Sequence, residues 1–208
     1  MKIAIFGGTG QTGQHLVQQA LDLGHEVVLL ARTPSKVTTK HDKLAVIEGD
    51  ILDKDRVTET IKGMDAVMSV LGPTHNKPEF IISQGTENIL NTMKEQNVRR
   101  IIISAGAGVR DPKGKPKLID RFFGILLNLI SKNAVEDMKR VVEQVRNSDR
   151  DWIVVRVPRL TDQPPQGTLK VGYVGDITPQ LSRTDMATFM LQQLDNNTHL
   201  RKAPAISN

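Results

Sequence analysis

The chain of 208 residues contains no cysteine, which excludes disulfide bonds, thiolate nucleophiles and thiolate metal ligands. Aromatic residues are scarce as well: there are five phenylalanines, one tryptophan and one tyrosine. Lysine and arginine exceed aspartate and glutamate by only 28 to 23, and this excess is spread along the sequence. A nucleic-acid surface usually combines a concentrated basic stripe with accessible aromatics. We therefore expect no nucleic-acid partner, and a surface that favours anionic ligands.

Long hydrophobic runs are also missing. Hydrophobic residues make up 38% of the chain, and no uninterrupted apolar run reaches membrane length. The first apolar segment begins at Ile3, which leaves no room for a signal peptide before it. The five histidines show no metal-ligand spacing. The sequence therefore predicts a cytoplasmic protein without membrane contact or metal, which acts on a small molecule as a monomer or weak homodimer.

The most informative segment is the glycine-rich beginning, MKIAIFGGTGQTG. The apolar run Ile3–Phe6 leads into three glycines and then into a helix-like stretch, Gln14–Leu23. A strand, a glycine turn and a helix N-terminus together bind the pyrophosphate of a dinucleotide, since free amides and the helix dipole attract anions. The alternative is a flexible turn that binds nothing, because the spacing is G-x-x-G-x-x-G. The residues expected to bind the cofactor here are Gly7, Thr9, Gly10, Gln11, Thr12 and Gly13.

Each glycine has its own expected role. Gly7 allows a sharp exit from the strand, and Gly10 lets the backbone approach a phosphate without a Cβ in the way. Gly13 lets the helix pack closely on the sheet.

Strand-like and helix-like segments alternate to about residue 157. The expected strands are Ile3–Phe6, His25–Leu30, Leu44–Glu48, Asp65–Leu71, Arg99–Ser104 and Trp152–Val157. The expected helices are Gln14–Leu23, Lys54–Lys62, Ile81–Gln96 and a longer pattern over Leu118–Arg146. This alternation predicts one α/β domain over residues 1–208, a Rossmann-type doubly wound parallel sheet in strand order 3-2-1-4-5-6. Ligands are expected outside the carboxyl ends of the strands.

Two regions depart from this alternation and are expected on the substrate side, near residues 105–132 and 158–180. Ala105–Lys117 is rich in glycine, proline and charge, and is either a mobile lid or an exposed connection. The apolar stretch Phe122–Ile130 is expected to be a buried helix or a subunit contact. A short C-terminal extension follows, with a strand near Thr168–Tyr173 and a last helix starting at Ser182. Ser182-Arg-Thr-Asp185 has the form of a capping box, so both end residues are expected to be structural.

The residues after the second and third strands predict NADP(H) as the cofactor. NAD sites place an acidic residue after the second strand, whereas this chain has Arg32 and Thr33 there. Arg32 can form a bidentate pair with a 2′-phosphate. After the third strand, Asp50 can accept a hydrogen bond from the adenine amino group or can cap a turn. The remaining predicted cofactor contacts near these strand ends are Ile51, Leu71 and Gly72.

Taken in order, the segments GGTGQTG, LLART, EGDILD, VLGP, IIISAGAG and VVRVPRLTDQPPQG resemble the atypical short-chain dehydrogenase/reductases that bind NAD(P)H. Within them the chain is similar to the flavin reductase/biliverdin-IXβ reductase group and its bacterial relatives. Most of the wider superfamily uses a Tyr-x-x-x-Lys pair as general acid/base. The only tyrosine, Tyr173, lies far beyond the expected helix, and Ile177 stands where its lysine would be. The resemblance therefore implies a site without this pair.

The missing pair limits the chemistry. A simple ketone needs a proton donor in the transition state, whereas a flavin or linear tetrapyrrole spreads the added electron density over a conjugated system. We therefore expect an NADPH-dependent reductase with flavin as substrate, not as prosthetic group, or with a tetrapyrrole-like acceptor. The alternative is a non-catalytic NADP(H)-binding redox sensor, similar to the NmrA-like regulators. An isomerase or epimerase is disfavoured because it also needs an acid/base pair.

The resemblance also implies the residues at the nicotinamide. The serine after the fifth strand is here Ser104, and the Pro-Pro-His segment of the group appears as Val157-Pro158-Arg159. Ser104 and Pro158 are expected near the cofactor, and Ser104 and Arg159 are expected to position the substrate. Arg159 replaces the histidine of the group, so protonation by that histidine is not expected. His75, after the fourth strand, is the histidine nearest to the predicted cleft.

Overall fold

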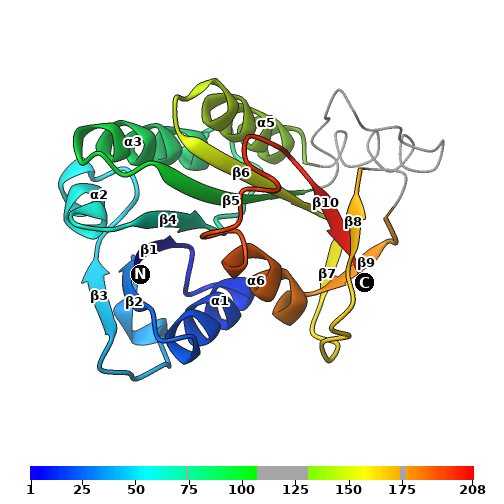
Figure 1. Cartoon of the computed structure of the whole chain (residues 1–208). Coiled ribbons are helices and arrows are strands. Elements are labelled where there is room, and N and C mark those ends of the chain that lie inside the picture. Colours follow the sequence, from blue (N-terminus) through cyan, green and yellow to red (C-terminus); the bar gives the residue numbers. More distant parts are fainter. Residues whose placement is uncertain (74, 107–130, 174–176) are drawn as a thin grey trace.

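The computed structural model describes residues 1–73, 75–106, 131–173 and 177–208. A mainly parallel sheet organises these residues, in the order β3-β2-β1-β4-β5-β6-β10-β8 (Figure 1). Its strands are, in chain order, β1 (Lys2–Phe6), β2 (Glu26–Ala31), β3 (Leu44–Glu48), β4 (Ala66–Ser69), β5 (Arg100–Gly106), β6 (Asp151–Val157), β8 (Lys170–Gly172) and β10 (Ala205–Ser207). The predicted Rossmann-type fold and the order 3-2-1-4-5-6 are confirmed.

Helices cover both faces of this sheet (Figure 1). The helices α1 and α6 share one hydrophobic core with the sheet, and α2, α3 and α5 share the other. Their bounds are α1 (Gln11–Asp22), α2 (Lys54–Ile61), α3 (Ile81–Glu95), α5 (Lys132–Asn147) and α6 (Arg183–Leu191), with a 3-10 turn η1 (Pro34–Lys36). Among the described helices, none combines the length and the apolar character needed to cross a bilayer.

The central strands are buried on both sides because successive side chains point to opposite faces of a sheet. In β1, Ile3 and Ile5 belong to the core under α1 and α6, whereas Ala4 and Phe6 belong to the core under α2, α3 and α5. The edge strand β3 differs, since several of its side chains are exposed. Burial on both faces, as expected for a parallel sheet covered by helices, therefore holds for the centre of the sheet and not for this edge.

Residues with positive φ mark the returns from helices to strands. Gly24 follows α1 with a φ of 83°, and Gly63 follows α2 with a φ of 74°. Asn97 follows α3 with a φ of 58°. At the first of these returns, the His25 amide donates to the carbonyl oxygen of Ala20 over 3.0 Å, which closes the helix end.

The C-terminal segment adds structure that the sequence did not predict. Strand β10 pairs in parallel with β6 and antiparallel with β8, so the chain end extends the sheet. A separate parallel pair is formed by β7 (Arg159–Thr161) and β9 (Gln180–Ser182). The predicted short strand near residues 168–173 corresponds to β8.

The predicted capping box at the start of α6 is wrong in its hydrogen bonds. Ser182 occupies the N-cap position, but its side chain makes no capping hydrogen bond. The Asp185 carboxylate accepts instead from the amides of Gln166 and Gly167, at 2.8 and 3.3 Å, and from Asn208 Nδ2 at 2.8 Å. Asp185 is therefore structural, as expected, but it holds a distant loop and the C-terminal residue instead of its own helix.

Most of the predicted lid and apolar stretch lies outside the described residues. This applies to residues 107–117 and to Phe122–Ile130. Ala105 and Gly106 continue β5 two residues beyond the predicted strand end. Of the long helical pattern Leu118–Arg146, the described part is α5, which begins at Lys132.

The starts of α3 and α5 are each capped by a residue from the other segment. Phe80, before α3, has a φ of 50° and provides no side-chain cap. Asp137 of α5 accepts hydrogen bonds there from the amides of Ile82 and Ser83, at 3.1 and 2.9 Å. In return, Oδ1 of Asn76, in the loop before α3, accepts from the amides of Asn133 and Ala134 in α5, at 2.9 and 3.2 Å. This exchange satisfies amides that a helix N-terminus otherwise leaves without a partner.

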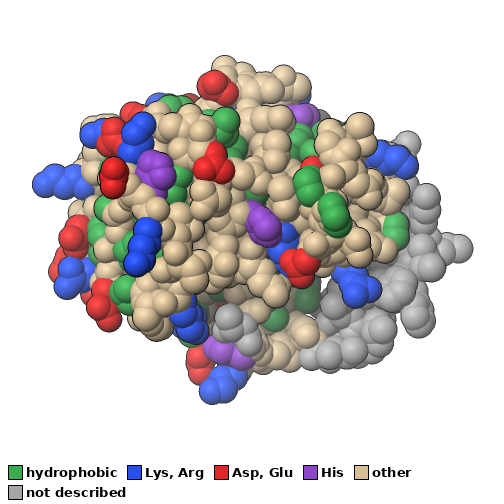
Figure 2. Space-filling model, turned by 90° about the horizontal axis from the view of Figure 1, so that it is seen from below, with side chains coloured by type: hydrophobic (Ala, Val, Ile, Leu, Met, Phe, Trp, Pro, Cys, Tyr) green, Lys and Arg blue, Asp and Glu red, His purple; other side chains and the backbone are tan. Residues whose placement is uncertain are grey.

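Charged side chains of both signs are mixed on the surface seen from below in Figure 2. Basic groups alternate with acidic groups over the described part of this face, without a continuous basic stripe. This distribution agrees with the charge pattern of the sequence.

We predict that Asp137→Ala lowers the free energy of unfolding by about 1–3 kcal/mol, since it leaves two buried amides without an acceptor. Urea unfolding followed by circular dichroism measures this loss. Asp137→Asn keeps one acceptor oxygen and is expected to lose less. Equal stability of the alanine variant and the parent protein would show that the cap contributes nothing.

Candidate functional site

The turn between β1 and α1 is built on close backbone contacts. Gly7 has a φ of 86°, and the Gly10 amide donates to its carbonyl oxygen over 3.1 Å. A Cβ added to Gly13 would lie 2.1 Å from that same oxygen, so only glycine permits this contact. The predicted close packing at the third glycine is confirmed. The helix begins at Gln11, three residues before the predicted start, so Gly13 lies within its first turn.

Gly10 is the N-cap of α1, and no side chain caps the helix there. A Cβ at Gly10 would meet the Gly7 oxygen at 3.3 Å, which is a tight contact but not a clash. The chain itself therefore tolerates a side chain at this position far better than at Gly13. The uncapped helix N-terminus and the missing Cβ form a cradle that suits a phosphate group.

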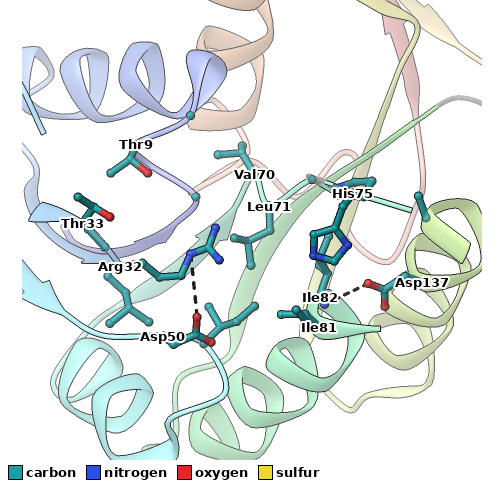
Figure 3. Close-up of a pocket in the computed structure, with 18 of the residues that line it drawn as sticks. Thr9, Arg32, Thr33, Asp50, Val70, Leu71, His75, Ile81, Ile82 and Asp137 are labelled. Atoms are coloured by element: carbon teal, nitrogen blue, oxygen red, sulfur yellow. Dashed lines mark hydrogen bonds and ion pairs between the residues drawn. The ribbon is translucent and has the colours of Figure 1, made fainter. Parts of the chain in front are cut away.

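A groove runs from this turn across the carboxyl ends of the strands, where a doubly wound sheet binds its ligands (Figure 3). Residues after β1, β2, β3 and β4 line it, together with the starts of α3 and α5. They are Gly7, Thr9, Gly10, Leu30, Ala31, Arg32, Thr33, Lys36, Gly49, Asp50, Ile51, Val70, Leu71, Gly72, Pro73, His75, Lys77, Phe80, Ile81, Ile82, Asn133, Ala134 and Asp137.

Two cations lie at the end of the groove formed by β2 and β3. Arg32 and Lys36 both line it, and Arg32 Nε lies 4.0 Å from Oδ2 of Asp50 (Figure 3). The Arg32 side chain is 66% exposed, so this contact leaves the guanidinium accessible. Oδ1 of Asp50 accepts from the Leu52 amide at 2.9 Å. The turn-capping role considered for Asp50 is therefore present, with the second carboxylate oxygen directed to Arg32.

The opposite end of the groove is assembled from three segments. The loop after β4 contributes Leu71 and His75, α3 contributes Ile81 and Ile82, and α5 contributes Asp137. In Figure 3, Leu71 lies between Arg32 on one side and His75 on the other. This end is largely apolar apart from His75, Lys77 and the residues of α5.

Among the described residues, none makes a glycine necessary at residue 72. A Cβ built on Gly72 would have no atom of these residues within 4 Å. Leu71 and Gly72 both line the groove, and Leu71 also packs against the core under α2, α3 and α5. Their predicted contact with a cofactor ribose remains a prediction.

The other predicted site residues lie at the edge of this groove or beyond it. Gln11, Thr12 and Gly13 form the first turn of α1 and present their backbone there. Ser104 lies in β5 opposite Val155 of β6 and does not line the groove. Pro158 and Arg159 follow β6, and Arg159 begins β7 as an exposed residue. The roles predicted for Ser104, Pro158 and Arg159 at the nicotinamide therefore stay predictions.

The α5 helix carries two polar residues toward the groove with the four-residue spacing of a Tyr-x-x-x-Lys pair. They are Asn133 and Asp137. Nδ2 of Asn133 donates to the carbonyl oxygen of Asn76 at 2.9 Å, and Asp137 caps α3. Both side chains are thus engaged with backbone groups. Tyr173 does not line the groove.

Sequence reasoning missed the contribution of α3 and α5 to the site. The sequence predicts Ile81 and Ile82 only as the start of the helix Ile81–Gln96, and Asn133 and Asp137 only as part of the long pattern Leu118–Arg146. No local pattern could have brought them together. The one available signal was Gly85, whose missing Cβ lets α3 approach Ile51, at 2.4 Å from a built Cβ.

Comparison of the sequence with known proteins gives relatives of which several are named as enzymes. The oxidoreductase aflX of Aspergillus parasiticus is 28% identical over 73% of this chain and 61% of its own length. Cinnamoyl-CoA reductase 1 of Petunia hybrida is 28% identical over 56% of this chain and 39% of its own. The protein YwnB of Bacillus subtilis is 30% identical over 52% and 48%. The chain thus spans between about two fifths and three fifths of these relatives.

Solved structures share the fold at low sequence identity. The oxidoreductase ylbE of Lactococcus lactis superimposes with a TM-score of 0.84 and 16% identity, over 100% of this chain and 91% of its own. A short-chain dehydrogenase/reductase of Veillonella parvula, solved in complex with NADP, has a TM-score of 0.84 and 17% identity, over 100% and 94%. A family model described as NAD(P)H-binding matches residues 7–197, from the glycine turn to beyond α6. This chain is therefore a member of the NAD(P)H-binding family.

Proposed function

We propose that this protein is an NADPH-dependent reductase that transfers hydride to a flavin or a related conjugated acceptor, such as a linear tetrapyrrole. One observation carries the proposal. A single groove joins the glycine turn and two cations to an end where Asn133 and Asp137 have the spacing of a Tyr-x-x-x-Lys pair but form hydrogen bonds with backbone groups. The oxidoreductase and reductase names of the relatives agree with this class of reaction.

The adenine end supports NADPH over NADH. No acidic residue follows β2 directly, whereas Arg32 and Lys36 can both reach an anionic group in the groove. Thr33 adds a hydroxyl at the same end. The ion pair with Asp50 is long and exposed, so its loss on phosphate binding removes little stabilisation. The Veillonella protein of the same fold was solved with NADP.

The acceptor class follows from what the chain provides at the other end. When bound there, the reduced nicotinamide supplies a hydride. The apolar side chains of Leu71, Ile81 and Ile82 offer a surface that suits a flat conjugated ring and excludes water. The described groove contains no tyrosine to act as the usual acid. An acceptor that delocalises the added charge fits this arrangement better than an isolated ketone.

We predict that Gly10→Ala weakens NADPH binding by on the order of tenfold or more while the protein stays folded. The added Cβ fits the chain with only a tight contact of 3.3 Å but occupies the space that a phosphate needs. Fluorescence titration with NADPH and thermal unfolding measure the two effects. Gly13→Ala is the comparison, since its Cβ clashes with the backbone and is expected to lower stability itself. Undiminished NADPH affinity in Gly10→Ala would argue against phosphate binding at this turn.

We predict that Arg32→Gln weakens NADPH binding by about 1.5–3 kcal/mol, the range for hydrogen bonds to charged groups. NADH binding is expected to change much less, because NADH has no 2′-phosphate. Calorimetric titration with both nucleotides gives the difference. Arg99→Gln is the matched control, since Arg99 pairs with Asp151 near the amino ends of the strands. Equal losses for both nucleotides would show that Arg32 does not recognise the 2′-phosphate.

The proposed reaction is tested by stopped-flow mixing of the protein and NADPH with FMN, riboflavin or biliverdin. We expect NADPH oxidation above the protein-free rate for at least one of these acceptors. Tight NADP binding without turnover of any acceptor would contradict the enzyme and favour an NADP(H)-binding regulatory protein.

A further inference from the structure

We infer that His75 is the catalytic residue that delivers the proton to the acceptor after hydride transfer. This inference rests on the proposed reductase function and names the residue that completes the reaction. Hydride transfer leaves the acceptor one proton short of its neutral reduced form. A donor at the same end of the groove removes that charge as it forms.

The titratable side chains of the described groove can be compared one by one. Arg32, Lys36 and Asp50 lie at the opposite end, where the adenine half is expected. Asp137 accepts two backbone hydrogen bonds and is only 6% exposed, so it is a fixed acceptor and not a donor. Two groups are left, and these are His75 and Lys77.

His75 is the better placed of these two. The Lys77 side chain is 69% exposed and its ammonium lies 4.0 Å from Glu79, as expected for a solvated surface group. The His75 imidazole points into the groove beside Ile82 in Figure 3. An imidazole also gains and loses its proton near neutral pH, which suits a donor that must be recharged from solvent.

The contacts of the imidazole leave one nitrogen available. The Lys77 amide donates to Nδ1 over 3.4 Å, so Nε2 carries the proton of the neutral ring. Nε2 lies 3.7 Å from Oε2 of Glu79. That distance is too long for a hydrogen bond, so the Nε2 proton is not held by the carboxylate.

The reaction balances with these parts. The nicotinamide C–H bond breaks, and its hydrogen and electron pair form a new bond on the acceptor, which is reduced while NADPH is oxidised. In the protonated ring both nitrogens carry a proton, so the 3.4 Å contact from the Lys77 amide to Nδ1 belongs to the neutral ring alone. The Nε2–H bond of the protonated ring breaks, its electron pair stays on Nε2, and the proton moves to a nitrogen of the acceptor. His75 then takes a proton from water, which its half-exposed side chain can reach.

The first test locates His75 without any turnover. In a protein with 15N-labelled histidine, the His75 ring signal is assigned by its absence in His75→Gln. We expect NADP+ to shift this signal, because the nicotinamide half lies beside it. Adenosine 2′,5′-bisphosphate, which carries only the adenine half, is expected to leave it in place. A His75 signal unmoved by NADP+ would overturn the inference.

The second test measures the proton transfer. His75→Gln is expected to lower the single-turnover rate of NADPH oxidation by on the order of 100-fold, at unchanged NADPH affinity. Added imidazole is expected to restore part of the rate in His75→Gly. His41→Gln is the matched control. Nδ1 of His41 also accepts a hydrogen bond from the amide two residues later, that of Lys43, but His41 does not line the groove.

The outcomes separate this inference from the proposed function. If the parent protein oxidises NADPH with none of the acceptors, the proposed function fails and the ring-signal test alone reports the position of His75. If the parent protein turns over and His75→Gln does so at the same rate, only the inference fails. A loss of rate that imidazole does not restore, together with weaker NADPH binding, would show a structural role and also overturn it.

Discussion

The contact between Gly13 and the carbonyl oxygen of Gly7 is the constraint on which the site depends. Because no Cβ separates them, α1 can begin immediately beyond β1 and pack on the end of that strand. Gly7 in turn lies against the backbone of Val70 at the end of β4, where a built Cβ would be 2.9 Å away. The helix N-terminus is thus held between the two halves of the sheet, where the strand order reverses. The groove opens at this point because β2 and β4 pair with β1 on opposite sides, and the chain after each strand turns away in opposite directions.

The parts of the fold that are local in sequence could be predicted from it. Alternating apolar strands and helices gave the sheet order, and residues tolerant of positive φ, such as Gly24 and Asn97, gave the returns. The addition of β10 beside β6 had no such signal, since β10 is only three residues long and pairs with a strand about fifty positions earlier. The carboxylate of Asp185 also resembled a local cap and instead binds a distant loop. Long-range hydrogen bonds leave no mark on periodicity.

The two ends of the groove differ in how far the sequence could predict them. The end with Arg32 and Asp50 comes from residues directly after strands, so strand order alone brings them together. The end with Ile82 and Asp137 depends on how two helices pack, which spacing does not encode. The lack of a suitably placed tyrosine could be read from the sequence, because the chain has a single tyrosine at position 173. Only the structure showed that Asn133 and Asp137 line the groove with the four-residue spacing of the missing pair.

The exchanged caps of α3 and α5 have a consequence for how this sequence can change. Each helix start depends on a side chain that lies more than fifty residues away, Asp137 in one case and Asn76 in the other. A relative that lost one of these residues would need a new acceptor within its own helix start, so the two regions are expected to vary together in evolution. Transplanting the loop before α3 into another member of the fold would likewise fail unless the first turns of α5 were transplanted with it.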